Sequence, residues 1–191
     1  MTTRISLLCV PATAAIRAGR FPADDPLAAA DVAQLAALDI ARPLGKWDHV
    51  LTSPMACARA TAQALGFDAA IDDDLREVDY GRWSGQSLKE LAATEPDGIA
   101  AWLADPGMDA HGGESLQAVI GRAGQWLAHR APGHALAVTH ASVIRAIVVH
   151  VLSAPAQAAM QLDIAPLTLT TLSSQSGKWR VSAVAVPLSR Y

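Results

Sequence analysis

The chain has 191 residues, 51% of them hydrophobic and 17% charged, a composition that excludes a disordered protein. Its formal net charge of -3 at pH 7 excludes the basic surface typical of nucleic-acid binding. Two cysteines are too few for a disulfide framework, which favours a reducing compartment.

The first half of the chain alternates between short apolar runs and helix signals. Residues 5–10 form an apolar run that ends at Pro11 and predicts a buried strand. The run is shorter than the apolar part of a usual signal peptide, so we expect a cytoplasmic protein. Asp25-Pro26 and Ser53-Pro54 both have the cap-and-proline pattern of a helix start. The elements expected next are a helix over 26–38, a strand over 47–51 and a helix over 54–65.

The second half begins with an irregular stretch, residues 69–113, that is rich in glycine, proline and aspartate. A long, semi-regular insertion of this kind is often functional. The apolar sequence beyond it is interrupted by His140, Arg145 and His150, so neither a membrane span nor a membrane partner is expected. The elements expected here are helices over 87–93, 98–103, 114–130 and 141–152, a strand over 135–139, and a hairpin of 167–172 and 179–186.

The alternation of strands and helices predicts a three-layer α/β/α sandwich with a mostly parallel sheet. The C-terminal hairpin would add antiparallel strands at one edge. No linker or repeat interrupts the sequence, so residues 1–191 are predicted to form a single domain. Ligands of such sheets bind beyond the carboxyl ends of the strands, which places a site near Val10, Ser53 and His140.

Five segments in order along the chain carry a recognisable set of motifs. They read Leu7-Leu8-Cys9-Val10-Pro11-Ala12-Thr13, Ser53-Pro54-Met55-Ala56-Cys57-Ala58-Arg59-Ala60-Thr61-Ala62, Leu75-x-Glu77 with Gly81, Trp83 and Gly85, Gly112-Gly113-Glu114-Ser115 before Arg122, and Val138-Thr139-His140 before Ile144-Arg145. In this order and spacing they resemble the histidine phosphatase superfamily, also called phosphoglycerate mutase-like, over nearly the whole chain. The resemblance implies that family's fold and, as an expectation, a phosphatase or phosphomutase origin.

The resemblance also implies where a reaction centre would lie. In the family, a histidine nucleophile and an arginine stand in the first motif, a second arginine in the second, a carboxylate in the third and a further histidine in the last. Here Val10 occupies the nucleophile position, and Cys9 and Cys57 occupy the arginine positions, while Glu77 and His140 match the family. Valine has no lone pair and cannot be phosphorylated. The resemblance thus predicts Glu77 and His140 as retained catalytic positions, in a ligand pocket that Cys9, Val10 and Cys57 also line.

The two cysteines have several interpretations. Free cysteine most often behaves as a small buried hydrophobic side chain, and we favour that interpretation for Cys9 and Cys57. A reactive thiol or redox pair is an alternative, as is a metal site of both cysteines with His140 and Glu77. The positions suit long arginine side chains rather than a bridge, so we expect free thiols, no metal and no cofactor.

Other residues near the predicted site also have two interpretations. Arg17, Arg20 and Arg59 are either replacement charges at the pocket mouth or, as we favour, ordinary surface arginines. Trp83 and Trp102 lie in the insertion and either contact a ligand or anchor the packing of a loop-rich segment.

The leading hypothesis is a pseudoenzyme of this family that binds a small, unidentified molecule, an anion being one option, without phosphohistidine catalysis. One alternative is a repurposed enzyme that uses Glu77, His140 and Cys9 or Cys57. Another is a non-catalytic interaction module. An active phosphatase or phosphoglycerate mutase ranks last, because the ordinary mechanism lacks its nucleophile here. A homo-oligomer is left open.

Overall fold

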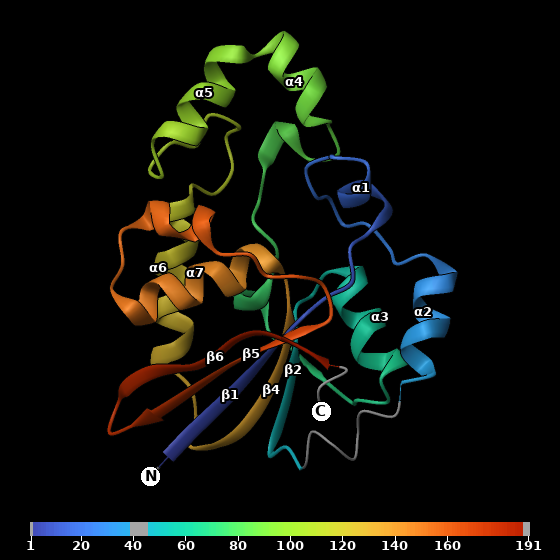
Figure 1. The fold of residues 1–191 in the computed structure, drawn as a ribbon, viewed down its shortest axis with the longest axis vertical. Helices are drawn as coiled ribbons and strands as arrows, with labels where there is room; N and C mark the ends of the chain where they lie inside the picture. Colours follow the sequence, from blue (N-terminus) through green and yellow to red (C-terminus); the bar gives the residue numbers. More distant parts are fainter. Residues whose placement is uncertain (1, 39–45, 189–191) are drawn as a thin grey trace.

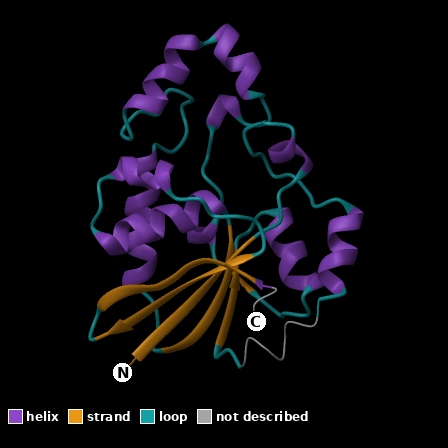
Figure 2. Ribbon diagram, in the orientation of Figure 1, coloured by secondary structure: helices purple, strands orange, loops and turns teal. Residues whose placement is uncertain are grey.

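Six strands form one sheet in the order β3-β2-β4-β1-β5-β6, with helices on both of its faces (Figure 2). The computed structural model describes residues 2–38 and 46–188, so the ends of the predicted domain and residues 39–45 lie outside the described residues. The α/β/α sandwich predicted from the sequence is confirmed. The strands are β1 Thr2–Cys9, β2 His49–Thr52, β3 Ala70–Ile71, β4 Gly133–Thr139, β5 Thr168–Gln175 and β6 Lys178–Pro187.

The helices divide into three groups around the sheet (Figure 1). The α-helices are α1 Ala14–Arg17, α2 Ala29–Ala36, α3 Ala56–Ala64, α4 Leu88–Thr94, α5 Pro96–Ala104, α6 Leu116–Ala128 and α7 Ala141–Leu152, and the 3-10 helices are η1 Asp73–Leu75, η2 Gly81–Trp83 and η3 Ala156–Gln161. Figure 1 shows α6 and α7 on one face of the sheet, α2 and α3 on the other, and α4 and α5 at the far end. Of the helices described, none combines the length and the apolar character that crossing a membrane requires.

The first strand, predicted to be buried, lies in the centre of the sheet. It pairs in parallel with β4, so that Cys9 lies opposite Thr139, and in antiparallel fashion with β5. Because side chains alternate along a strand, Ile5 and Leu7 face the α6–α7 side while Leu8 faces α2 and α3. All three are fully buried. The carboxyl ends of β1 and β4 are therefore fixed side by side by a core that covers both faces.

The helices predicted after Asp25-Pro26 and Ser53-Pro54 begin later than expected, at Ala29 and at Ala56. Neither Asp25 nor Ser53 caps the helix that follows it. The first N–H of α3, on Ala56, donates instead to the Asp24 carboxylate at 2.6 Å, which lies 32 residues earlier in the chain. Both local cap signals were therefore wrong: at α3 a distant acidic side chain binds the first N–H, and at α2 the N-cap residue Ala28 makes no side-chain cap hydrogen bond. The sequence also gave no signal for α1, β3 and η3.

The insertion is built around a small aromatic core. Trp83 is fully buried against Phe21, Leu91 and Ile99, so its role is that of a packing anchor. Phe21 also joins the insertion by backbone bonds, because its N–H donates to the carbonyl of Gln86 at 2.9 Å. The segment after α1 and the insertion therefore form one unit above the carboxyl end of the sheet.

Glycine is required where the insertion crosses the chain before α6. Gly81 has φ of +48°, and a Cβ atom there would lie 2.3 Å from the carbonyl oxygen of His111. An L side chain would meet both the strained backbone conformation and this contact. The close approach explains why the third motif contains glycine at this position.

Candidate functional site

A pocket of about 290 Å³ opens beyond the carboxyl ends of β1 and β4. We call it the central pocket. The five residues predicted from the sequence, Cys9, Val10, Cys57, Glu77 and His140, all line it. The rest of its wall is mostly apolar and comes from Pro11, Ala12, Thr13, Ile16, Pro22, Ala23, Asp25, Tyr80, Ala141, Ser142, Arg145, Ile164 and Pro166. The structure thus brings the predicted residues together, while their binding of a ligand stays a prediction.

His140 is the residue before the first turn of α7 and is only 3% exposed. Its Nδ1 lies 3.5 Å from Oε2 of Glu77, and its Nε2 lies 2.8 Å from the hydroxyl of Ser53. A carboxylate can only accept, so we assign the ring proton to Nδ1, and the Ser53 hydroxyl donates to Nε2. Desolvation lowers the pKa of His140, although the Glu77 carboxylate acts in the opposite direction. The imidazole is therefore neutral near pH 7, with Nε2 bound to the Ser53 hydroxyl and Nδ1 facing the Glu77 carboxylate.

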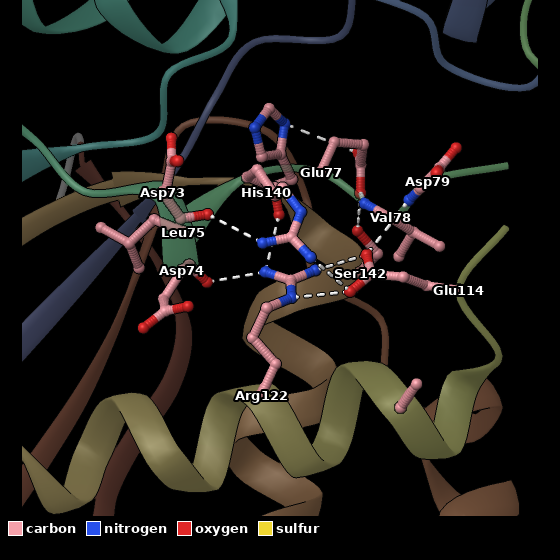
Figure 3. Close-up of polar contacts among 12 residues, drawn as sticks. Asp73, Asp74, Leu75, Glu77, Val78, Asp79, Glu114, Arg122, His140 and Ser142 are labelled. Atoms are coloured by element: carbon pink, nitrogen blue, oxygen red, sulfur yellow. Dashed lines mark hydrogen bonds and ion pairs between the residues drawn. The ribbon is translucent and has the colours of Figure 1, made fainter. Parts of the chain in front are cut away.

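Glu77 has partners for both carboxylate oxygens (Figure 3). Oε1 accepts from the N–H of Val78 at 2.8 Å and from the hydroxyl of Ser142, and Oε2 faces His140. Its side chain is only 11% exposed. Ser142 was missed by the sequence analysis, although its place two residues after a strand-end histidine, in the first turn of a helix, could have pointed to it.

The chain just before Glu77 is anchored by Arg122 of α6 (Figure 3). One guanidinium nitrogen donates to the carbonyls of Asp74 at 2.6 Å and Arg76 at 3.1 Å. The other two donate to Glu114, each at 2.9 Å. Two parallel hydrogen bonds from one guanidinium to one carboxylate fix the orientation of the two side chains as well as the distance between them. Arg122 therefore positions Glu77 without lining the central pocket.

The charged side chains of the central pocket are Asp25, Glu77 and Arg145, so acidic groups outnumber basic ones. Arg145 belongs to α7 and donates from Nε to the carbonyl of Leu162 at 2.8 Å. Arg145 belongs to the last sequence motif, from which no role for its side chain was predicted. Asp25 was expected to cap a helix, and it instead lies in the pocket wall.

The arginines considered as replacement charges lie elsewhere in the described chain. Arg17 pairs with Asp31 at 2.7 Å and Arg20 approaches Glu90 at 3.7 Å, while Arg59 is exposed on α3. The central pocket is lined by none of them, so far as residues 2–38 and 46–188 show. The interpretation as surface arginines agrees with these positions.

The two cysteines are free and buried, and they belong to different sides of the sheet. Cys9 packs with the α6–α7 core and Cys57 with the α2–α3 core. Burial, followed by the negative charge of Glu77, raises the pKa of each thiol to about 12. These thiols are therefore protonated and poorly nucleophilic. Across the described ranges, no group of three or more histidine, cysteine or acidic side chains could hold a metal ion.

We expect both thiols of the native protein to resist a thiol reagent at about pH 8, because their pKa values lie far above it. Unfolding in denaturant should then release two reactive thiols per chain. Titration with and without denaturant, beside elemental analysis for zinc, checks this. Rapid labelling of the native protein, or one zinc ion per chain, would contradict the buried-hydrophobic interpretation.

We expect the free energy of unfolding to decrease as the pH falls, because the folded protein holds the imidazole of His140 neutral. Because the folded state lowers the pKa of His140, the unfolded chain binds more protons below its own pKa of about 6.5. This contribution is complete above that pH and is lost as the pH falls. Between about pH 7.5 and about pH 5.5, urea unfolding should show a smaller decrease in the free energy of unfolding for His140→Gln than for the native protein. The exposed His129→Gln variant is the control, and an equal loss in all three proteins would be inconsistent with this prediction.

The chain is similar to a known protein family and to solved structures. The model of the histidine phosphatase superfamily (branch 1) matches residues 14–187. The mycobacterial glucosyl-3-phosphoglycerate phosphatase in complex with VO3 is 25% identical with a TM-score of 0.82, covering 96% of this chain and 99% of that one. A putative alpha-ribazole-5'-P phosphatase of Escherichia coli is 20% identical with a TM-score of 0.83, covering 97% and 98%. The latter likeness concerns the fold alone.

Two curated relatives match a shorter part of the chain. A bifunctional protein of Mycobacterium tuberculosis is 39% identical over 77 residues, which cover 38% of this chain and 21% of that protein. Phosphoserine phosphatase 1 of Hydrogenobacter thermophilus is 30% identical over 80 residues, covering 39% and 38%. This chain thus matches less than two fifths of the length of either relative.

Proposed function

The chain belongs to the histidine phosphatase superfamily, and we propose that it binds a small molecule in the central pocket without forming a phosphohistidine. The observation that carries this proposal is Val10, which lies in the pocket wall at the end of β1, where the family motif has its nucleophilic histidine. A valine side chain has no atom that can attack phosphorus. The family match, which begins only at residue 14, after that motif, also supports the proposal.

The charge of the pocket supports a ligand other than a phosphate ester. Phosphoryl transfer depends on cations around the equatorial oxygens, and the two expected arginine positions here hold Cys9 and Cys57. The N-terminus of α3, a favourable place for an anion, already binds the Asp24 carboxylate. With Glu77 also in the wall, a doubly charged phosphate would meet repulsion, so the ligand is neutral or carries one charge.

The repurposed-enzyme alternative has one observation in its favour. Ser53, His140 and Glu77 form a hydroxyl–imidazole–carboxylate series, the order used by nucleophilic hydrolases. Ser53, however, is fully buried and does not line the central pocket, so a substrate in that pocket could not reach its hydroxyl. The series serves better to hold His140 in one tautomer. The open volume of the pocket argues against the other alternative, a non-catalytic interaction module, whose pocket would be filled by its own side chains.

A thermal-shift screen of neutral and singly charged small molecules, with phosphate monoesters as comparison, tests the proposal. Ala12 lines the central pocket, so Ala12→Phe should block it, while Ala14→Phe makes the same change at an exposed position outside the wall. A ligand at 100 times its Kd stabilises by about 2.7 kcal/mol, which for a domain of this size raises Tm by about 5–10 °C. We expect such a shift in the native and Ala14→Phe proteins and none in Ala12→Phe. No hit at all, or equal shifts in all three, would reject the proposal.

A further inference from the structure

A second cavity, of about 250 Å³, lies beside the central pocket. We call it the side pocket. Tyr80, Ser142 and Arg145 line both cavities and so form the boundary between them. The other walls of the side pocket come from α5, from the start of α6 and from η3. A molecule bound in the central pocket therefore has a neighbouring space into which it can extend.

The side pocket is lined by large apolar side chains that remain open to solvent. Leu103 of α5 is 58% exposed and Met160 of η3 is 56% exposed, and both line this cavity together with Trp102. Exposed apolar side chains that gather around a concave surface are typical of ligand sites, where a ligand would remove them from water. Leucine, methionine and tryptophan side chains suit an apolar body, such as a ring or a short hydrocarbon chain.

The charges around Arg145 decide the direction from which an anion can approach. Arg145 is the one charged residue of the side pocket, whereas Asp25 and Glu77 join it in the central pocket. Within the described part of the chain its guanidinium makes one hydrogen bond, from Nε to Leu162. The terminal nitrogens are thus free to donate in pairs, the geometry that matches a carboxylate. An anion avoids the two carboxylates when it approaches from the side pocket.

We propose that the side pocket binds the apolar body of an amphipathic monocarboxylate, whose carboxylate pairs with Arg145 at the boundary. This inference rests on the function proposed above and names the chemical class of the ligand. The remaining, uncharged part of the ligand extends past Tyr80 into the central pocket. A carboxylate needs only one cation, so the missing arginines do not prevent its binding.

Three probes separate the apolar body from the charge: 3-phenylpropanoate, the matched alcohol 3-phenylpropan-1-ol, and inorganic phosphate. Binding is followed by tryptophan fluorescence, because Trp102 lines the side pocket, and Trp102→Phe identifies its signal. A charge-assisted hydrogen bond contributes about 1.5–3 kcal/mol, so the acid should bind about tenfold or more tightly than the alcohol. Phosphate, which has no apolar body, should not compete with the acid.

Variants at two positions test the geometry. Arg145→Gln should reduce the affinity for the acid to that for the alcohol. Leu103 is exposed, so its substitutions should not disturb folding. Leu103→Asp should weaken binding of the acid about tenfold or more by adding a like charge, while Leu103→Asn, of the same shape, should weaken it less.

Equal binding of acid and alcohol by the native protein, no binding of the acid, or equal effects of the two Leu103 variants would each overturn this inference. If that happens while Ala12→Phe still removes the shifts in the thermal screen, the side-pocket inference is wrong and the proposed function stands. If the screen also fails, both are wrong.

Discussion

Val10→His alone is expected to give no measurable phosphatase turnover, whereas the same change with Cys9→Arg and Cys57→Arg is expected to give turnover that is readily measured. The single variant has a nucleophile but no arginine on the phosphoryl oxygens. Removal of one such electrostatic donor costs about 10²–10³ in kcat, so two arginines account for about 10⁴–10⁶. The comparison of kcat/KM for a phosphate ester between the single and triple variants measures this difference.

The matched control for this comparison is a triple variant with Val10→Asn in place of Val10→His. It has the same added charges and a polar side chain at residue 10, but no nucleophilic nitrogen. We expect it to be inactive. Equal and high kcat/KM values for the single and triple histidine variants would show that Cys9 and Cys57 do not stand at charge-binding positions.

Arg122→Met is expected to be the most destabilising single change near the site, with a loss of about 3–5 kcal/mol in the free energy of unfolding. Arg122 is 8% exposed, and its removal takes a donor from two backbone carbonyls and leaves Glu114 with only the Arg76 guanidinium and the N–H of Asp79. A buried group that loses its partner bears the full cost of desolvation. Denaturant unfolding measures the loss, which corresponds to a fall in Tm of about 10 °C.

The control for this stability prediction is Arg17→Met, which also removes an arginine from an ion pair with a carboxylate. The Arg17 side chain is 48% exposed, so its pair with Asp31 lies largely in water and contributes little. We expect Arg17→Met to unfold close to the native midpoint. If Arg122→Met lowers the free energy of unfolding no more than Arg17→Met does, then the hydrogen bonds of Arg122 do not stabilise the chain around Glu77.

The fold was predictable because its core elements are simple in sequence. Helix α7 was predicted with its observed bounds, since an apolar helical pattern follows a buried strand without a break. Parallel strands bring their carboxyl ends together, which is why Val10 and His140 could be placed in one site before any contact was known. The helix starts were not predictable in the same way, because Asp24 caps α3 from 32 residues away.

The members of the central pocket were predictable, but its charge was not. Glu77 and His140 belong to motifs that predict a site. Asp25 instead had the sequence pattern of a helix cap, and Arg145 belongs to a motif but had no predicted role, so neither charge was expected in the pocket. The direction of a side chain depends on tertiary packing, and a sequence pattern carries little information about it. For the same reason the positions of Ser53 at a strand end and of Ser142 two residues after His140 did not reveal that their hydroxyls would bind the two ends of the Glu77–His140 pair.

Trapping of a phosphorylated enzyme tests the absence of phosphohistidine chemistry most directly. The native protein is mixed with a radiolabelled phosphate ester, quenched in base to preserve phosphohistidine, and examined for labelled protein while ester cleavage is followed. The active triple variant, Val10→His with both arginines, is the positive control. We expect no label on the native protein and ester cleavage at the rate of the buffer alone. A labelled histidine that forms and decays during turnover by the native protein would contradict the proposed function.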